Sequence, residues 1–314
     1  MKRWQLSPER YRWITGVALG LLSVIVVSGA CVRLTGSGLG CDDWPNCNAT
    51  KFIDVSSTHA AIEQINRLVT GLVAVAVILA VLGSLARTPR RRDLTLLSLG
   101  LVGGVVGQIV LGGITVLVDL HPVAVQGHFL LSMVLQANAV ALYYRARQPD
   151  GPRRGVVTAP TRTHVRALMA LTLVSVVFGT IVTGSGPHAG DEEARRFDLS
   201  ISAAARMHGI AVWVAVAVCV VLMWRLRTRS ADRAVLDHLV VAWVCVAIAQ
   251  AGIGYLQYFT GVPAALVAVH VAGATVLFSV AWWMQEALYE RGDVTAPTES
   301  GEAPDELGAL VDHG

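Results

Sequence analysis

Long stretches without a charged residue alternate along the chain with short polar or basic segments. The charge-free stretches cover residues 13–32, 68–86, 94–118, 120–144, 167–190, 207–224 and 238–285. A helix needs about 20 apolar residues to cross the core of a bilayer. The last stretch is long enough for two helices and is interrupted by Tyr258-Phe-Thr-Gly-Val-Pro263, which is typical of a tight turn. The pattern therefore predicts an all-α integral membrane protein with eight transmembrane helices.

Composition favours a membrane protein over a large soluble one. Hydrophobic residues make up 54% of the chain and charged residues 15%, whereas soluble domains carry roughly 25% charged residues. So little polar sequence could not cover so many apolar helices in water. No small-residue cleavage pattern ends the first apolar stretch, so we expect a retained helix and not a signal peptide.

Basic residues occupy every second connection between the predicted helices. They gather before the first helix, after the second, between the fourth and fifth, and after the sixth. Such connections face the cytoplasm, so we expect both termini there, in a bacterial cell membrane. No aromatic residues are interleaved with these clusters, so nucleic-acid binding is not expected. Residues 291–314 are acidic and rich in Pro, Gly and Thr, and are predicted to form a disordered cytoplasmic tail.

The chain contains an internal repeat. A shift of 142 residues superimposes Gln108 on Gln250, Gly112 on Gly254, His128 on His270, and Asn66 on His208. A second match, of Thr35-Gly-Ser-Gly38 with Thr183-Gly-Ser-Gly186, needs a shift of 148. We therefore expect two four-helix units, residues 1–150 and 151–290. Because each unit has an even number of helices, we expect two tandem bundles related by a pseudo-twofold axis along the membrane normal.

The four repeat positions Asn66, His128, His208 and His270 lie at one predicted depth. Each falls about two turns into a helix that begins on the outer face, on the order of 10 Å below the surface. His208 and His270 can then meet across the centre of the second bundle, which is the arrangement of a haem with two histidine ligands. Zinc is disfavoured because no third or fourth ligand lies at that level.

The first bundle differs from the second at this level. Its pair is Asn66 and His128, and asparagine is a poor ligand for haem iron, so we expect a more loosely held haem with an open or weakly filled position. Glu63 lies one turn before Asn66, and Arg67 follows it. Glu63 is either an acid–base group beside the iron or one partner of an i,i+4 helix pair with Arg67.

The second bundle lacks the Glu63 carboxylate but carries an arginine near its histidines. The position equivalent to Glu63 is Ala205, so the carboxylate belongs to one site only, and Arg206 either pairs with haem propionates or marks the interface.

Cys41 and Cys47 flank a short outer-loop segment on the oxidising side of the membrane, so we expect a disulfide, which is either a structural staple or a redox-active pair. The other cysteines, Cys31, Cys219 and Cys245, are expected to be packing residues.

The sequence resembles the haem A synthase family, in a bacterial and actinobacterial-like form. The resemblance is carried by Val32-Arg-Leu-Thr-Gly-Ser-Gly-Leu-Gly-Cys-Asp-Asp-Trp-Pro-Asn-Cys47, by Glu63-Gln-Ile-Asn-Arg67 and by the repeat histidines. It implies oxidation of the C8 methyl group of haem O to a formyl group, giving haem A. It further implies a haem b held by His208 and His270, and a substrate haem beside Glu63 and His128. Asn66 departs from the family pattern, which has a histidine there.

Two other functions share parts of this pattern. A b-type cytochrome that passes electrons would need the paired histidines but neither Glu63 nor a second haem site. A non-catalytic haem carrier would bind haem O without oxidising it. For the synthase, we expect links to haem O synthase and to cytochrome oxidase assembly, and a membrane electron donor or acceptor. The sequence leaves open whether the protein forms a homo-oligomer.

Overall fold

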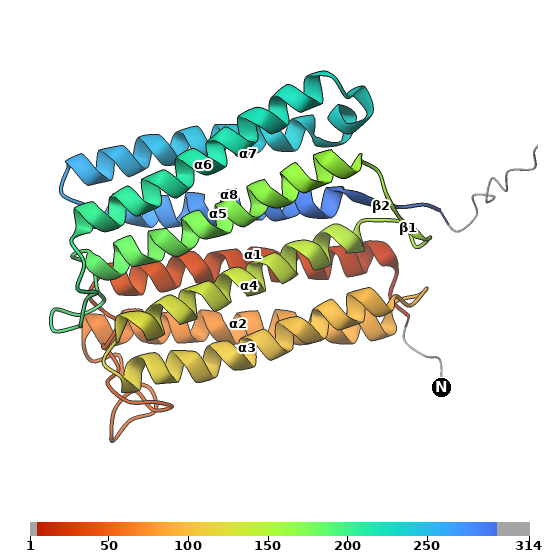
Figure 1. Cartoon of the computed structure of the whole chain (residues 1–314). Coiled ribbons are helices and arrows are strands. Elements are labelled where there is room, and N and C mark those ends of the chain that lie inside the picture. The colour runs from red at the N-terminus through yellow and green to blue at the C-terminus, as the bar shows by residue number, and fades with distance from the viewer. Residues whose placement is uncertain (1–4, 294–314) are drawn as a thin grey trace, which may run out of the picture.

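The computed structural model describes residues 5–293, and its helices lie side by side in one elongated body (Figure 1). Within these residues there are eight helices, each long and apolar enough to cross a membrane, which confirms the predicted all-α membrane architecture. The helices are α1 (Pro8–Leu34), α2 (Thr58–Ala86), α3 (Arg92–Leu117), α4 (Pro122–Ala146), α5 (Ala159–Ser185), α6 (Ile201–Arg227), α7 (Ser230–Phe259) and α8 (Ala264–Ala287).

The helices extend beyond the charge-free stretches, and at three of them a capping side chain sets the first residue. The side chain of Ser7 accepts a hydrogen bond from the Arg10 amide and starts α1 at Pro8, five residues before the first apolar stretch. Ser57 and Ser200 cap α2 and α6 in the same way. Such side chains satisfy backbone N–H groups that have no partner within the helix. Polar segments at the membrane surface therefore remain helical, which the apolar pattern alone does not reveal.

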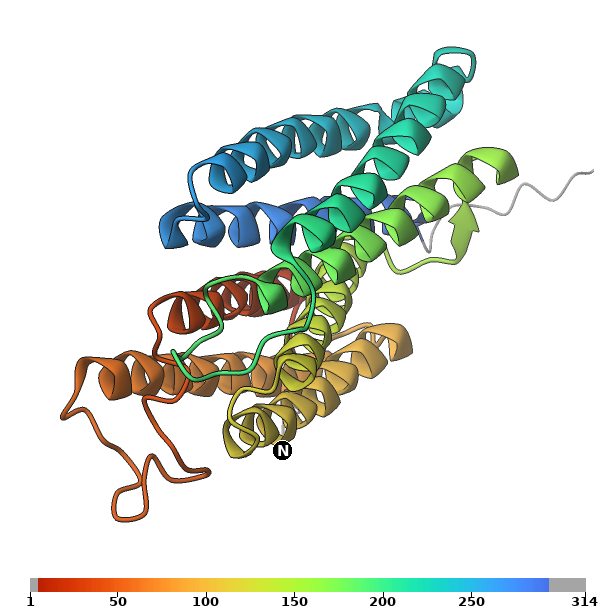
Figure 2. The same ribbon diagram turned by 60° about the vertical axis from the view of Figure 1, so that its left-hand side comes forward.

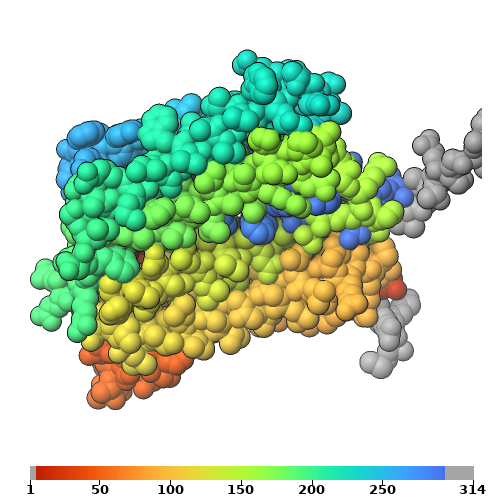
Figure 3. All heavy atoms as spheres, in the orientation of Figure 1, coloured from red at the N-terminus to blue at the C-terminus, as the bar shows by residue number. Residues whose placement is uncertain are grey.

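The helices pack in two groups of four, called here the N-terminal half (α1–α4) and the C-terminal half (α5–α8). Within each half, every helix contacts the next one, and the last contacts the first. The halves meet where α8 packs against α1 and α4, and α4 also contacts α5. Figure 3 shows the two halves in contact along the length of the helices, and Figure 2 shows the same arrangement of helices from another side. The boundaries at 150 and 290 and the pseudo-twofold axis stay predictions.

All four outer connections lie at one end of the molecule, and the basic connections lie at the other end (Figure 1). At the basic end, β1 (Arg153–Gly155) pairs antiparallel with β2 (Tyr289–Arg291), a small sheet that the sequence did not predict. Arg291, the first residue of the predicted tail, therefore lies in a strand. The remainder of that tail, residues 294–314, lies outside the described residues.

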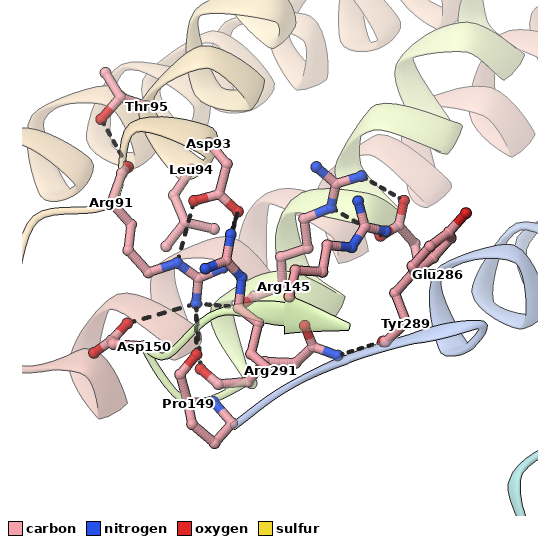
Figure 4. Close-up of polar contacts among 12 residues, drawn as sticks. Arg91, Asp93, Leu94, Thr95, Arg145, Pro149, Asp150, Glu286, Tyr289 and Arg291 are labelled. Atoms are coloured by element: carbon pink, nitrogen blue, oxygen red, sulfur yellow. Dashed lines mark hydrogen bonds and ion pairs between the residues drawn. The ribbon is translucent and has the colours of Figure 1, made fainter. Parts of the chain in front are cut away.

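Ion pairs reinforce this end of the contact between the halves (Figure 4). Arg145 of α4 contacts both carboxylate oxygens of Glu286 in α8, each at 2.8 Å. Asp93 of α3 is bound by Arg91 at 2.9 Å and by Arg291 of β2 at 3.2 Å. Two arginines at this end, Arg145 and Arg291, thus bridge the two halves, and Arg145 does so in addition to the topological role predicted for it.

Candidate functional site

A cavity of about 1460 Å³ opens between the helices of both halves. Small-molecule sites are usually about 300–1,000 Å³, so this cavity has room for more than one ordinary ligand. Its lining includes every predicted site residue of the helices: Glu63, Asn66, Arg67, His128, Arg206, His208 and His270. The folding of the chain therefore brings residues from α2, α4, α6 and α8 to one continuous space.

His208 on α6 and His270 on α8 meet inside the C-terminal half. Their ring centres are 6.3 Å apart and the ring planes are inclined by 74°. Two imidazoles bound to opposite sides of one metal ion, with metal–nitrogen bonds of about 2 Å, have ring centres roughly 6 Å apart. The separation fits a single metal ion between the rings, as in a haem with two axial histidines.

A backbone hydrogen bond sets the protonation of the His208 ring. Its Nδ1 lies 2.9 Å from the carbonyl oxygen of Ser175 on α5. Because a carbonyl oxygen only accepts, Nδ1 carries the proton and Nε2 keeps its lone pair. Metal-bound histidines are commonly oriented by such a second hydrogen bond. Ser175 is a partner that no motif in the sequence indicated.

Each of the three histidines lies against a glycine of the preceding helix. A Cβ atom added to Gly112 would lie 3.2 Å from Cε1 of His128, and one added to Gly179 or Gly254 would lie 3.4 Å from Cε1 of His208 or His270. The glycines therefore give the imidazole edges room against α3, α5 and α7. The internal repeat identified Gly112 and Gly254, but it did not identify Gly179.

The corresponding place in the N-terminal half is built differently. The amide oxygen of Asn66 accepts a hydrogen bond of 2.8 Å from the Ser28 hydroxyl on α1. His128 lies opposite on α4; its Nδ1 is buried without a partner among residues 5–293, and its carbonyl oxygen accepts from Gln108 at 3.1 Å. The only imidazole at the repeat positions of this half is therefore that of His128.

Glu63 is buried, and both its carboxylate oxygens are engaged. Oε1 accepts from Nη2 of Arg67 at 2.7 Å, and Oε2 accepts from the backbone N–H of Cys41 at 2.8 Å. Arg67 also donates to the carbonyl oxygens of Asn46 and Asp43 in the first outer loop. The predicted helix pair is present, and the same carboxylate also lines the cavity, so the two interpretations do not exclude each other.

The first outer loop, residues 35–57, contains a disulfide next to this site. Cys41 and Cys47 are bonded, which confirms that prediction, and both are buried. Of the cysteines expected to pack, Cys219 is buried but Cys245 is exposed on α7. That expectation is wrong for Cys245 because an apolar stretch does not reveal which face of a membrane helix points outward.

Two arginines line the C-terminal side of the cavity. Arg206 is exposed and donates to the carbonyl oxygen of Ser202 on its own helix at 3.3 Å, so its guanidinium has further donors free. Arg33, near the end of α1, reaches across to the carbonyl oxygen of Thr183 on α5 at 2.9 Å. The sequence contained Arg33 within its longest motif but gave no role for it.

Comparison with known proteins connects this geometry to a family. The model of the COX15-CtaA family, described as "Cytochrome oxidase assembly protein", matches residues 11–57 and 52–282. A "Heme A synthase" of Listeria monocytogenes is 25% identical over 273 residues, covering 82% of this chain and 89% of that protein. The "Heme A synthase" of Shewanella oneidensis is 28% identical over 191 residues, or 55% of each chain. That of Rhodopseudomonas palustris is 27% identical over 218 residues, so the chain spans little more than half the length of these last two relatives.

Proposed function

Because the chain belongs to the COX15-CtaA family of cytochrome oxidase assembly proteins, we propose that it is a membrane oxidoreductase that converts haem O to haem A. The observation that carries the proposal is one cavity with two unlike ends. One end has two facing histidines, and the other has a single histidine and a buried carboxylate. The names of the relatives agree with this activity.

In the C-terminal half, His208 and His270 would hold a resident haem b. The ring separation of 6.3 Å and the glycines against both rings support this assignment. When bound, the haem supplies one-electron transfer. The protein's contribution is to fix the ring of His208 through the Ser175 carbonyl group and to keep both imidazoles inside an apolar cavity.

In the N-terminal half, His128 would bind the iron of the substrate haem O. Oxidation of a methyl group to a formyl group adds an oxygen atom, in our proposal from water, and releases protons and electrons; the membrane acceptor takes up the electrons, so a proton acceptor is needed nearby. Glu63 fills this role in our proposal, because its carboxylate is the buried acidic group that lines the cavity on α2. Arg67 and the Cys41 amide hold that carboxylate in place, and general bases act only from a fixed position.

Asn66 suits a half that exchanges its ligand. Its amide oxygen already accepts from Ser28, so the iron would be held on one side only by a histidine. We propose that this weaker attachment lets haem O enter and haem A leave. Arg67 and Arg206, which line the cavity, are the cations proposed to bind haem propionates.

The eight apolar helices make the protein a multi-pass membrane protein. We propose that it resides in the bacterial cell membrane with both termini in the cytoplasm, since the basic connections lie at one end. Haem O synthase would supply its substrate, cytochrome oxidase assembly would consume its product, and a membrane donor or acceptor would exchange electrons with it. A homo-oligomer is compatible with this arrangement.

Co-expression with a haem O synthase tests the function. Haems extracted with acid and separated by chromatography should include haem A for the unchanged protein. Glu63→Gln should greatly reduce haem A while the haem held by His208 and His270 keeps its absorbance, and Glu290→Gln, an exposed carboxylate in β2, is the matched control. Absence of haem A with the unchanged protein would refute the activity. Haem b alone in the purified protein would then favour a b-type electron-transfer protein, and bound haem O a carrier.

A further inference from the structure

Arg33 is a partly buried cation without an anion. Its Nη2 donates to the carbonyl oxygen of Thr183 at 2.9 Å, and its Nε is buried and has no hydrogen-bond partner among residues 5–293. The buried arginines at the opposite end of the molecule are different: Arg87 and Arg91 each pair with a carboxylate. In the described part of the chain no carboxylate pairs with Arg33, and the charge that acts on it most is another cation, Arg196.

A cation in such surroundings is costly unless an anion joins it. The side chain also lines the cavity, so a ligand in the cavity can reach it. Gly190 of the α5–α6 loop lies against it: a Cβ on Gly190 would lie 3.4 Å from Cγ of Arg33, and the Gly190 carbonyl oxygen accepts a hydrogen bond from the Gly38 N–H. Arg33 therefore lies at the edge of the cavity, next to the Gly38–Gly190 contact between the two halves.

The contacts of Arg33 associate it with the histidine pair of the C-terminal half. Its partner Thr183 lies one turn after Gly179 on α5, and the Thr183 hydroxyl donates to the Gly179 carbonyl oxygen at 2.9 Å. Gly179 is the glycine against the His208 ring. Arg33 thus contacts α5 about 6 Å further toward the outer end than the histidine level, at 1.5 Å per residue. A tetrapyrrole bound at that level carries its carboxylates on short flexible arms.

We propose that Arg33, although it belongs to the N-terminal half, binds a propionate carboxylate of the tetrapyrrole held by His208 and His270. A guanidinium with free N–H groups suits a carboxylate because it can donate two hydrogen bonds in parallel. The proposal rests on the haem site of the proposed function. It adds a residue of α1 to a site otherwise built from α5–α8, so that occupancy of this site also ties the two halves together.

Haem binding to the full-length apoprotein in detergent tests the proposal. Haemin and its dimethyl ester, in which both carboxylates are blocked, are titrated into the unchanged protein, Arg33→Gln and the control Arg195→Gln. Arg195 is exposed in the α5–α6 loop. The absorbance of low-spin iron with two histidine ligands reports this site alone. Glutamine is uncharged and shorter than arginine, so Arg33→Gln also loses the hydrogen bond to the Thr183 carbonyl group, while the Arg145–Glu286 ion pair still joins the halves.

Arg33→Gln should weaken haemin binding about tenfold to a hundredfold, the range for hydrogen bonds to charged groups, and change ester binding less than about twofold. Arg195→Gln should bind both as the unchanged protein does. Equal weakening of acid and ester, or none, would overturn the proposal. If Arg33→Gln does not fold, Arg33→Lys keeps the charge and should weaken haemin binding alone, by about threefold to tenfold; equal losses for both ligands would again overturn it. The titration measures binding and not haem A formation, so it can succeed where the proposed activity fails.

Discussion

Removal of the Cys41–Cys47 disulfide should release the first outer loop without unfolding the helices. The perturbation is the double variant Cys41→Ser, Cys47→Ser. The two cysteines are six residues apart in the sequence and are buried against the start of α2. The bond therefore closes a small loop whose backbone directly contacts the site, through the Cys41 amide and Glu63.

The size of the effect follows from the length of the closed loop. Cross-linking a chain over so short a segment removes conformational entropy worth about 2.4 kcal/mol. Since about 1.4 kcal/mol is a factor of ten, the open form of the loop should become roughly fiftyfold more populated. Arg67 still holds the loop through the carbonyl oxygens of Asn46 and Asp43, so the change is a local opening and not a global one.

A lysine-specific protease measures this opening because the chain has only two lysines, Lys2 and Lys51. Lys51 lies in the loop, and its side chain is 55% exposed. Cleavage there divides the chain into residues 1–51 and 52–314, and its rate follows the open population when closing is faster than cutting. The control is Cys245→Ala, which removes an exposed thiol of α7 and should leave the rate unchanged.

Cleavage should accelerate roughly fiftyfold in the double serine variant, while the helical circular dichroism signal melts at nearly the same temperature. Formation of haem A should fall about tenfold or more, because Glu63 loses a hydrogen bond from a fixed amide. An acceleration below about fivefold would refute the reasoning, since Arg67 would then be the main restraint on the loop.

Three other predictions have defined outcomes. Arg145→Met should lower the free energy of unfolding in detergent by about 2–4 kcal/mol, because it leaves the buried Glu286 carboxylate poorly paired, and adding Glu286→Leu should recover part of that loss in a thermal melt. Gly254→Ala should keep the low-spin haem absorbance, since its Cβ would lie at an ordinary contact distance from His270, whereas Gly254→Val should lose it; equal spectra would contradict the packing. Asn66→His should add a second low-spin haem signal and slow the release of product in single-turnover measurements, and an unchanged spectrum would show that this position does not reach the iron.

The transmembrane helices could be predicted from the sequence because a bilayer imposes one length and one polarity on every crossing segment. Their ends could not be placed as well, since Ser7 and Ser57 extend α1 and α2 by capping and not by hydrophobicity. The sheet of β1 and β2 was missed because each strand is three residues long and its partner lies more than a hundred residues away.

The level of the site residues along their helices could be predicted from the sequence, but their hydrogen-bond partners could not. The repeat identified His128, His208 and His270 because equivalent positions on equivalent helices share one level. The hydrogen bonds from Cys41 to Glu63 and from Arg33 to Thr183 use residues that the other half does not repeat, since Ala205 stands at the position of Glu63 and Ile181 at that of Arg33. A self-match reveals only what both copies have kept, so contacts unique to one copy, or between copies, are invisible to it.

The difference between the halves is larger than a single residue. In three of the four repeat positions an imidazole lies against a glycine of the preceding helix. In the fourth, Asn66 instead receives a hydrogen bond from Ser28 of the preceding helix, so the ligand and its neighbour have changed together. Glu63, one turn away on the same face of α2, replaces the alanine of the other copy. Each of these changes either removes a ligand for iron or adds a proton acceptor, and all of them lie on or against α2. We therefore expect α2 to be the helix that distinguishes a half that turns over its haem from a half that keeps it.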